Sequence, residues 1–186
     1  MAPATRARSL PASERRLAII EATVPLLFQH GEQVTTRQIA EAAGIAEGTI
    51  FRVFSDKSEL LAATLEAALD RNSIDDALEA IDAELELEAA LIAATEIIQR
   101  RITDVWNLLS ALGPELRARA SRPMPDSDAL TALMASHADR WSTSPAEAAR
   151  LLRALTLALT HPMVAGVPHI AADIVQFFLH GVEVRP

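Results

Sequence analysis

The feature that most constrains the fold is a pair of short helical patterns separated by one glycine, between Thr35 and Phe54. Thr35 and Gln38 have the spacing of a capping box, which predicts that a helix begins there. Gly44 ends this helix, because so tight a turn favours a residue that tolerates a positive φ. The apolar side chains that the two helices share are Ile39, Ile45, Ile50 and Phe54. The segment therefore predicts two helices that cross at a short turn and share a small core.

The remainder of the chain is also helical in pattern. Alanine, leucine, arginine and glutamate recur, aromatic residues make up only 4% of the 186 residues, and no alternation with a period of two persists. Unbranched side chains lose little freedom in a helix, so this composition favours helices over strands. The sequence predicts an all-α protein with an N-terminal domain over residues 1–65 and a C-terminal helical domain over residues 66–186.

Glycine and proline mark the expected helix ends in the longer domain. Gly113 and Pro114 interrupt the chain, and the apolar run before them, over residues 84–112, is expected to form two helices that meet near residues 100–101. A later helix is expected from residues 126–127 to about Trp141, because aspartate and serine are common N-caps.

The charge distribution separates the two predicted domains. The net charge is −8, but residues 1–60 carry seven basic and seven acidic side chains, so the remainder holds the whole acidic excess. The arginines that come before Leu17 are Arg6, Arg8, Arg15 and Arg16. A local basic face matters more for phosphate contact than the total charge does, so the net charge does not exclude a nucleic-acid partner.

Composition excludes several other classes of site. The sequence has no cysteine, which rules out disulfides, thiolate metal ligands and a cysteine nucleophile. It also has no Gly-rich phosphate loop, no His-Glu-x-x-His motif and no nucleophile elbow. We therefore expect no enzymatic activity, no metal and no cofactor. The first residues lack the apolar segment of a secretory signal, and the apolar runs are too short to cross a bilayer, so a cytoplasmic location is expected.

Residues 39–57 read IAEAAGIAEGTIFRVFSDK. This segment resembles the signature of the TetR family of transcriptional regulators, roughly IAEAAGVSxGTLYxHFxSKEEL, and the match extends over residues 13 to about 65. The resemblance implies a three-helix helix-turn-helix domain that binds double-stranded DNA and a helical domain that binds a ligand and forms a homodimer. It further implies a repressor that a small-molecule effector releases from a two-fold-symmetric operator, although activation stays open. The alternative for the motif is a helical hairpin in an ordinary bundle.

The exposed positions of this segment are the predicted DNA contacts. The start of the second helix carries small residues, which permit close approach to a major groove. The resemblance implies phosphate or base contacts from the first helix, and a phosphate held by Lys57 together with the amides of the helix that follows. The predicted set is Thr35, Thr36, Arg37, Glu47, Gly48, Thr49, Phe51, Arg52 and Lys57.

Three positions depart from the family pattern. Phe51 stands where tyrosine is usual, Val53 replaces a polar or histidine position, and Ala46 replaces a serine cap. Loss of the cap costs on the order of 1 kcal/mol of helix stability. Fewer phosphate contacts would weaken nonspecific affinity, so a second hypothesis is a ligand-binding or adaptor protein of the same fold with weak or no DNA binding.

Two C-terminal segments are apolar on more than one face, which predicts that they are covered on two sides. One side would meet the core of the domain and the other a partner copy, which would place two recognition helices about one turn of DNA apart. The alternative is that both are internal core helices. The predicted interface is Leu152, Leu155, Leu159, Ile170, Ile174, Phe177 and Phe178.

A ligand pocket is predicted in the same domain. Met134, His137 and Trp141 have helical spacing, and they combine adaptable apolar walls with one polar anchor. The candidate lining residues are Trp106, Leu109, Met134, His137, Trp141 and Met163. The alternative is core packing, which is the commoner role of methionine and tryptophan at this spacing.

Overall fold

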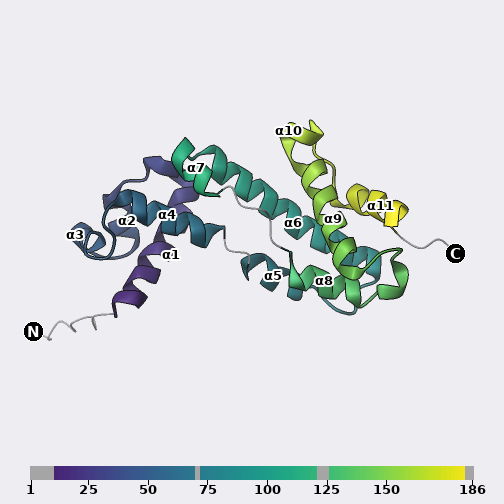
Figure 1. Cartoon of the computed structure of the whole chain (residues 1–186). Helices are drawn as coiled ribbons and strands as arrows, with labels where there is room; N and C mark the ends of the chain where they lie inside the picture. Colours follow the sequence, from purple (N-terminus) through teal and green to yellow (C-terminus); the bar gives the residue numbers. More distant parts are fainter. Residues whose placement is uncertain (1–10, 70–71, 121–125, 183–186) are drawn as a thin grey trace, which may run out of the picture. The chain divides into compact units, whose positions relative to one another are not determined.

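The computed structural model describes residues 11–69, 72–120 and 126–182. Within these ranges the structure contains helices and no strand, so the predicted all-α class is confirmed (Figure 1). Two of the N-terminal arginines, Arg6 and Arg8, lie outside the described residues. The contacts divide the chain into two units. The first combines residues 1–69 with residues 108–122, and the second combines residues 70–107 with residues 123–186.

The first unit is built from four N-terminal helices and a short later one. In it, α1 packs against α4 and α2, α2 packs against α3, and α7 packs against α4. The helices are α1 (Ala12–His30), α2 (Thr36–Ala42), α3 (Glu47–Ile50), α4 (Lys57–Ala68) and α7 (Pro114–Ala120), with a 3-10 turn η1 (Gly31–Gln33) after α1. Residues 108–122 were expected in the longer domain. They join the first unit because Leu108, Leu112 and Leu116 are buried in its core.

The core of the first unit holds the side chains predicted to be shared by the two short helices. Ile39, Ile50 and Phe54 are at most 1% exposed and lie in one cluster with Leu27 of α1. Ile45, at the turn, is half-buried against the same cluster. This cluster holds α3 against α1 and α2, so the orientation of α3 depends on tertiary packing.

The second unit combines most of α6 with five further helices. There, α9 packs against α8, α10 and α11, and α5 packs against α8. The helices are α5 (Asn72–Glu79), α6 (Leu87–Ser110), α8 (Asp128–Ala135), α9 (Pro145–Thr160), α10 (Pro162–Ala165) and α11 (Ala171–Val182), with a 3-10 turn η2 (Ala138–Arg140). No helix in the described ranges is both long and apolar enough to cross a membrane.

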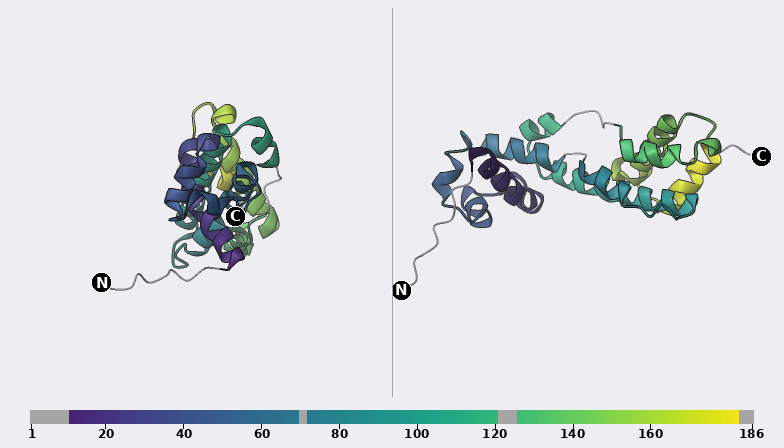
Figure 2. Two further views of the ribbon diagram at one scale, coloured as in Figure 1. Left: turned by 90° about the vertical axis from the view of Figure 1, so that its left-hand side faces the viewer. Right: turned by 90° about the horizontal axis from the view of Figure 1, so that it is seen from below.

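Two predicted helix boundaries in this part of the chain are wrong. α6 is one helix of 24 residues, not two that meet near residues 100–101, because no glycine or proline interrupts it (Figure 2). The helix that Ser127 caps ends at Ala135, well before Trp141. Trp141 has extended backbone, and its indole Nε1 donates a hydrogen bond back to the carbonyl oxygen of Met134 at 2.8 Å.

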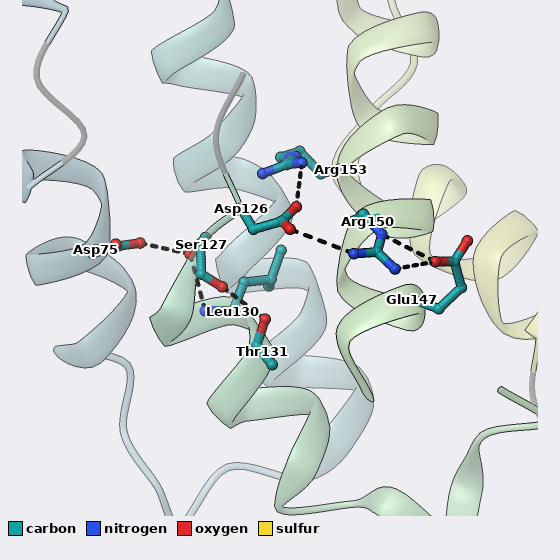
Figure 3. A network of polar contacts seen from close by, with 8 residues as sticks. All are labelled: Asp75, Asp126, Ser127, Leu130, Thr131, Glu147, Arg150 and Arg153. Atoms are coloured by element: carbon teal, nitrogen blue, oxygen red, sulfur yellow. Dashed lines mark hydrogen bonds and ion pairs between the residues drawn. The ribbon is translucent and has the colours of Figure 1, made fainter. Parts of the chain in front are cut away.

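A polar network joins the start of α8 to α5 and α9 (Figure 3). Ser127 Oγ accepts a hydrogen bond from the Leu130 N–H at 3.1 Å and donates one to Asp75 at 2.6 Å. Asp126 accepts hydrogen bonds from Arg150 and Arg153 of α9 at 3.4 and 3.1 Å. Asp126 and Arg150 are exposed and Arg153 is half-buried, so the ion pairs orient α8 but add little stability.

Candidate nucleic-acid interface

The turn between α2 and α3 has the geometry that the sequence predicts. Thr35 Oγ1 accepts a hydrogen bond from the Gln38 N–H at 3.2 Å, and Gln38 Oε1 accepts one from the Thr35 N–H at 2.8 Å. The capping box is therefore complete. Gly44 has a φ of 65°, in the region that favours glycine. The next helix begins after Ala46 without a side-chain cap, as the absence of serine at this position predicts.

Glu47 joins the first turn of α3 to the first turn of α2. The Thr36 hydroxyl donates a hydrogen bond to the Glu47 carboxylate across the turn. Both residues belong to the predicted DNA-binding set, and this contact gives them a structural role in the free protein. The carboxylate that begins α3 is thereby held toward the first helix of the motif.

The other predicted contacts lie on the surface of α2, α3 and the turn that follows. Arg37 is 82% exposed, and its Nε donates to Glu41 at 3.1 Å within α2. An exposed pair of this kind contributes little stability, so the guanidinium can exchange the carboxylate for a phosphate. Phe51 is 51% exposed, which offers an aromatic ring where a tyrosine would offer a hydroxyl. All nine members of the set are exposed or half-buried; those other than Thr36, Glu47 and Lys57 are Thr35, Arg37, Gly48, Thr49, Phe51 and Arg52.

Lys57 is engaged with the protein itself. Its Nζ donates a hydrogen bond to the carbonyl oxygen of Glu32 in η1 at 2.8 Å. The first turn of α4 is capped by Asp56, whose carboxylate accepts a hydrogen bond from the Glu59 N–H at 2.8 Å. An ammonium has three donors, so a phosphate contact by Lys57 stays a prediction. The side chain of Asp56, however, already occupies one of the helix amides expected to share that phosphate.

A hollow of about 460 Å³ lies next to Lys57 in the first unit. Its charged lining residues are Lys57, Arg119, Glu32 and Glu115. Two carboxylates balance the two cations, so the hollow offers no excess positive charge to an anion. It therefore adds no second phosphate site to the motif.

The apolar side chain of Val53 contributes to the packing of the first unit. It is half-buried and packs against the core cluster of the first unit, just before the fully buried Phe54. The departure from a polar residue at this position thus serves packing at the end of the turn after α3. Its backbone carbonyl still takes part in a polar contact, which involves Arg16.

Arg16 is a functional candidate that the sequence analysis missed. Its guanidinium carbon lies 4.2 Å from the ring centroid of Phe54. Its Nη1 donates to the Val53 carbonyl at 3.3 Å and to Glu59 Oε1 at 3.0 Å. The other carboxylate oxygen of Glu59 accepts a hydrogen bond from the Ser55 N–H at 2.7 Å. We call these five residues the Arg16 clamp.

A sequence signal for the clamp did exist. Arg16 lies four, seven and eleven residues before Ile20, Thr23 and Leu27, so it continues the buried stripe of α1 rather than its outer face. The sequence analysis grouped it with the N-terminal arginines as part of a basic face. Its place on the inner stripe predicts contact with the rest of the unit instead.

Replacing Glu59 with glutamine should remove part of the pH dependence of stability. The pKa of Glu59 is lowered, mainly because Ser55 donates hydrogen bonds to its carboxylate and then because Arg16 lies beside it. Such a group stabilises the fold fully above its unfolded-state pKa, and this stabilisation is lost as the pH falls through the lowered folded-state pKa. We expect the thermal midpoint, followed by circular dichroism, to fall more for the wild type than for Glu59→Gln between about pH 6 and about pH 3. Glu21→Gln, an exposed change on α1, is the control, and an equal fall in wild type and Glu59→Gln would contradict the prediction.

Three of the seven predicted interface residues are buried within their own unit. Leu152, Ile174 and Phe178 are at most 2% exposed within one chain and belong to the core cluster of the second unit. These faces of α9 and α11 cover their own unit, so the side chains offer no surface to a partner. Leu155 and Leu159 are half-buried against the same cluster.

The predicted ligand residues of α8 belong to the core. Met134 and Trp141 are 0% and 5% exposed, and the hydrogen bond between them closes the chain after α8. The spacing argument fails because the helix ends at Ala135, so His137 lies beyond it in a turn. Met134 and Trp141 thus take part in core packing, the alternative interpretation, and a ligand contact by either residue stays a prediction.

The remaining pocket candidates lie in different surroundings. Met163 is 79% exposed on α10, and Leu109 packs against the core of the first unit. Trp106 meets a residue that was not predicted, since its ring lies 4.2 Å from that of His161 in an edge-on arrangement. The Nδ1 atom of His161 and the hydroxyl of Thr95 are buried and have no hydrogen-bond partner among the described residues.

Comparison with known proteins agrees with this geometry. Residues 19–64 match the model of the bacterial regulatory proteins of the tetR family. A structure described as a TetR-family transcriptional regulator from Mesorhizobium loti has a TM-score of 0.64 at 16% identity, covering 95% of this chain and 100% of that one. A TetR transcriptional regulator from Streptomyces coelicolor has a TM-score of 0.55 at 24% identity, covering 92% and 99%. The TetR-like regulator LfrR from Mycobacterium smegmatis, in complex with proflavine, has a TM-score of 0.50 at 23% identity, covering 92% and 99%.

The fold and the turn geometry define an all-helical protein with an N-terminal helix-turn-helix. The family match covers that motif, and the structural matches extend the same fold over nearly the whole chain. The N-terminal module thus belongs to the TetR family, and the chain has the fold of a TetR-family transcriptional regulator.

Proposed function

We propose that the chain is a homodimeric repressor that a small-molecule effector releases from a two-fold-symmetric operator. The observation that carries the proposal is the exposed surface of a complete helix-turn-helix, in which Arg37, Thr49 and Arg52 lie over a buried core. Side chains at the start of the second helix of such a motif read base edges in a major groove. Gly48, with open space around it, permits close approach to the groove. We place this action on DNA in the cytoplasm.

Apolar exposure on the second unit supports a homodimer. Ile170 and Phe177, from the predicted interface, are 66% and 52% exposed. α9 packs against both α10 and α11 (Figure 1). These helices and their connections expose further apolar side chains. These are Leu151, Leu157, Met163, Val164 and Val167. Exposed apolar residues gathered on neighbouring elements mark an interaction surface. We assign this surface to a second copy, because a dimer would present two helix-turn-helix motifs to one operator.

Unsatisfied polar atoms support an effector site in the second unit. Buried polar atoms are nearly always hydrogen-bonded, so Thr95 Oγ1 and His161 Nδ1 call for a partner. The edge-on contact of Trp106 with His161 adds an aromatic wall. The proflavine complex of LfrR supports the view that this fold accepts small aromatic molecules. An effector that prefers one of two conformations would shift the population away from the DNA-bound one.

Selection of bound duplexes from a random pool, at moderate salt, tests the proposal. An enriched two-fold-symmetric site would support a dimeric regulator and supply the operator for the later experiments. A folded dimer that enriches no sequence would contradict it.

Arg37→Ala should weaken DNA binding on every sequence by a similar factor. A residue that contacts phosphate contributes to affinity through counterion release, so its loss lowers the slope of log K against log salt by about 0.9. The measurement is a salt titration of binding to the selected duplex and to an unrelated duplex. Arg150→Ala removes an ion-paired arginine of the second unit and is the matched control. An unchanged slope for Arg37→Ala would refute the phosphate contact.

The second candidate function is a ligand-binding or adaptor protein of the same fold. Phe51 and Val53 favour it, because neither side chain can donate a hydrogen bond to phosphate. The salt titration separates the two functions. A regulator shows a steep salt dependence on its selected site, whereas an adaptor with no DNA contact shows no saturable binding at any salt concentration.

A further inference from the structure

The clamp centred on Arg16 links α1 to the turn that follows α3 and to the first turn of α4. One guanidinium covers the Phe54 ring, donates to the Val53 carbonyl and pairs with Glu59 in the first turn of α4. The Glu59 carboxylate in turn accepts a hydrogen bond from the Ser55 N–H at 2.7 Å. The contacts form a closed path from α1 through the turn into α4, and Arg16 is the member contributed by α1.

α3 needs such support because it is very short. It spans Glu47–Ile50, and Phe51 to Val53 continue it only as turns. A helix of one turn is unstable by itself, so tertiary contacts must determine its position. At its start it has the hydrogen bond between Thr36 and Glu47, and beyond its end it has the clamp.

The contacts match the particular chemistry of arginine. A planar guanidinium can stack on an aromatic face while its edge donates hydrogen bonds to a carbonyl and a carboxylate. An ammonium is a compact charge and cannot make these contacts together in the same geometry. The Arg16 side chain is 38% exposed, and its contacts with Val53, Phe54 and Glu59 all lie within the first unit.

We propose that Arg16 is a positioning residue for the DNA contacts of α3, acting through Val53, Phe54 and Glu59 rather than by touching DNA. The inference rests on the proposed DNA-binding function. It assigns to the clamp the task of holding Phe51 and Arg52 where they meet the groove. The competing role is direct phosphate contact by an arginine near the N-terminus.

Whether Glu59→Gln raises or lowers the affinity for DNA distinguishes a positioning role of Arg16 from direct phosphate contact. Removing a negative charge from the DNA-binding unit strengthens binding if electrostatics alone act. A positioning role predicts the opposite, because Glu59→Gln weakens the hold on Arg16 and on Ser55. Arg16→Lys makes the same distinction, since it keeps the charge but loses the stacked, forked geometry.

The experiment measures binding of the full chain to the selected duplex and to a scrambled duplex of equal length. The variants are Arg16→Lys, Arg16→Met and Glu59→Gln, with Arg150→Met as the control. All are compared at a temperature where their helical circular dichroism equals that of the wild type. We expect each clamp variant to lose about tenfold in affinity for the selected duplex and less than about twofold for the scrambled one. The salt slope on the selected duplex should stay within about 0.3 of the wild type, against the decrease of about 0.9 that a lost phosphate contact gives.

Several outcomes would overturn the proposal. These are wild-type selectivity in Arg16→Lys, tighter binding in Glu59→Gln, equal losses on both duplexes, or a slope reduced by about 0.9 in Arg16→Met. If the wild type binds no DNA, the proposed function fails and the clamp is tested separately by amide exchange. Faster exchange at residues 51–55 than in the rest of the first unit of Arg16→Lys would support the clamp, and unchanged exchange there would overturn it.

Discussion

Gly31→Ala should destabilise the first unit by roughly 3–5 kcal/mol, the largest loss of stability that we expect from one added methyl group. Gly31 has φ 54° and ψ −139°, a conformation that is essentially restricted to glycine and costs other residues about 1–3 kcal/mol. A Cβ there would also lie 2.3 Å from the carbonyl oxygen of Ala111, which is backbone and cannot rotate away. Relieving that overlap adds about 1–3 kcal/mol. The measurement is urea unfolding followed by circular dichroism.

Two other glycines are matched controls for the two contributions. Gly44 has a φ of 65° but nothing within 4 Å of an added Cβ, so Gly44→Ala carries the backbone cost alone, about 1–2 kcal/mol. Gly48 has neither a positive φ nor a close neighbour, so alanine there should stabilise α3 by up to about 1 kcal/mol. Equal losses of unfolding free energy for Gly31→Ala and Gly44→Ala would contradict an overlap between the added Cβ at residue 31 and the carbonyl oxygen of Ala111.

Replacing Gly31 should also disturb the hydrogen bonds that the next residue, Glu32, makes to other parts of the first unit. Glu32 accepts a hydrogen bond from the Gly113 N–H at 2.7 Å, and its carbonyl accepts one from Lys57. Moving η1 away from residues 111–113 would break the first contact and disturb the second. Since Lys57 begins α4, the substitution at Gly31 would also change the position of the residues at the end of the helix-turn-helix.

Local signals explain which boundaries could be predicted from sequence. The cap at Thr35 and the turn at Gly44 each depend on residues within one turn, and the structure has both of them. The helix-turn-helix was predictable for the same reason, because its caps, its turn and its core lie within 20 residues. The prediction of two helices over residues 84–112 failed because two arginines do not interrupt a helix.

The candidate sites required information that the sequence does not carry locally. α9 and α11 are apolar on more than one side, and only the packing shows that Leu152 and Phe178 face their own core. The return of Trp141 to Met134 is likewise a contact made after the helix has ended. The position of Arg16 on the inner stripe of α1 predicts that it contacts the rest of the unit, but its partners lie 37 to 43 positions later and appear only in the folded unit.

Phe177→Glu should convert the proposed dimer into monomers and lower operator affinity by about 100-fold or more. Phe177 lies on α11, is 52% exposed, and its ring meets His169 edge-on at 5.7 Å. A large aromatic side chain near the centre of an interface contributes more than most contacts, and a buried unpaired carboxylate is costly. Linking two half-site contacts in one dimer raises affinity by about 10²–10⁴, which a monomer loses. The measurements are light scattering for the assembly and a binding titration on the selected duplex.

The residue that follows Phe177 shows why the choice of position matters. Phe178 is 2% exposed in the core of the second unit, so Phe178→Glu should unfold that unit and would say nothing about a partner. Leu85→Glu is the better control, since Leu85 is 39% exposed in the same unit outside α9 and α11. A dimer that survives Phe177→Glu would move the interface away from α11. Monomers that keep full operator affinity would instead show that one helix-turn-helix is enough to bind the operator. That result would contradict the proposal of a two-fold-symmetric operator.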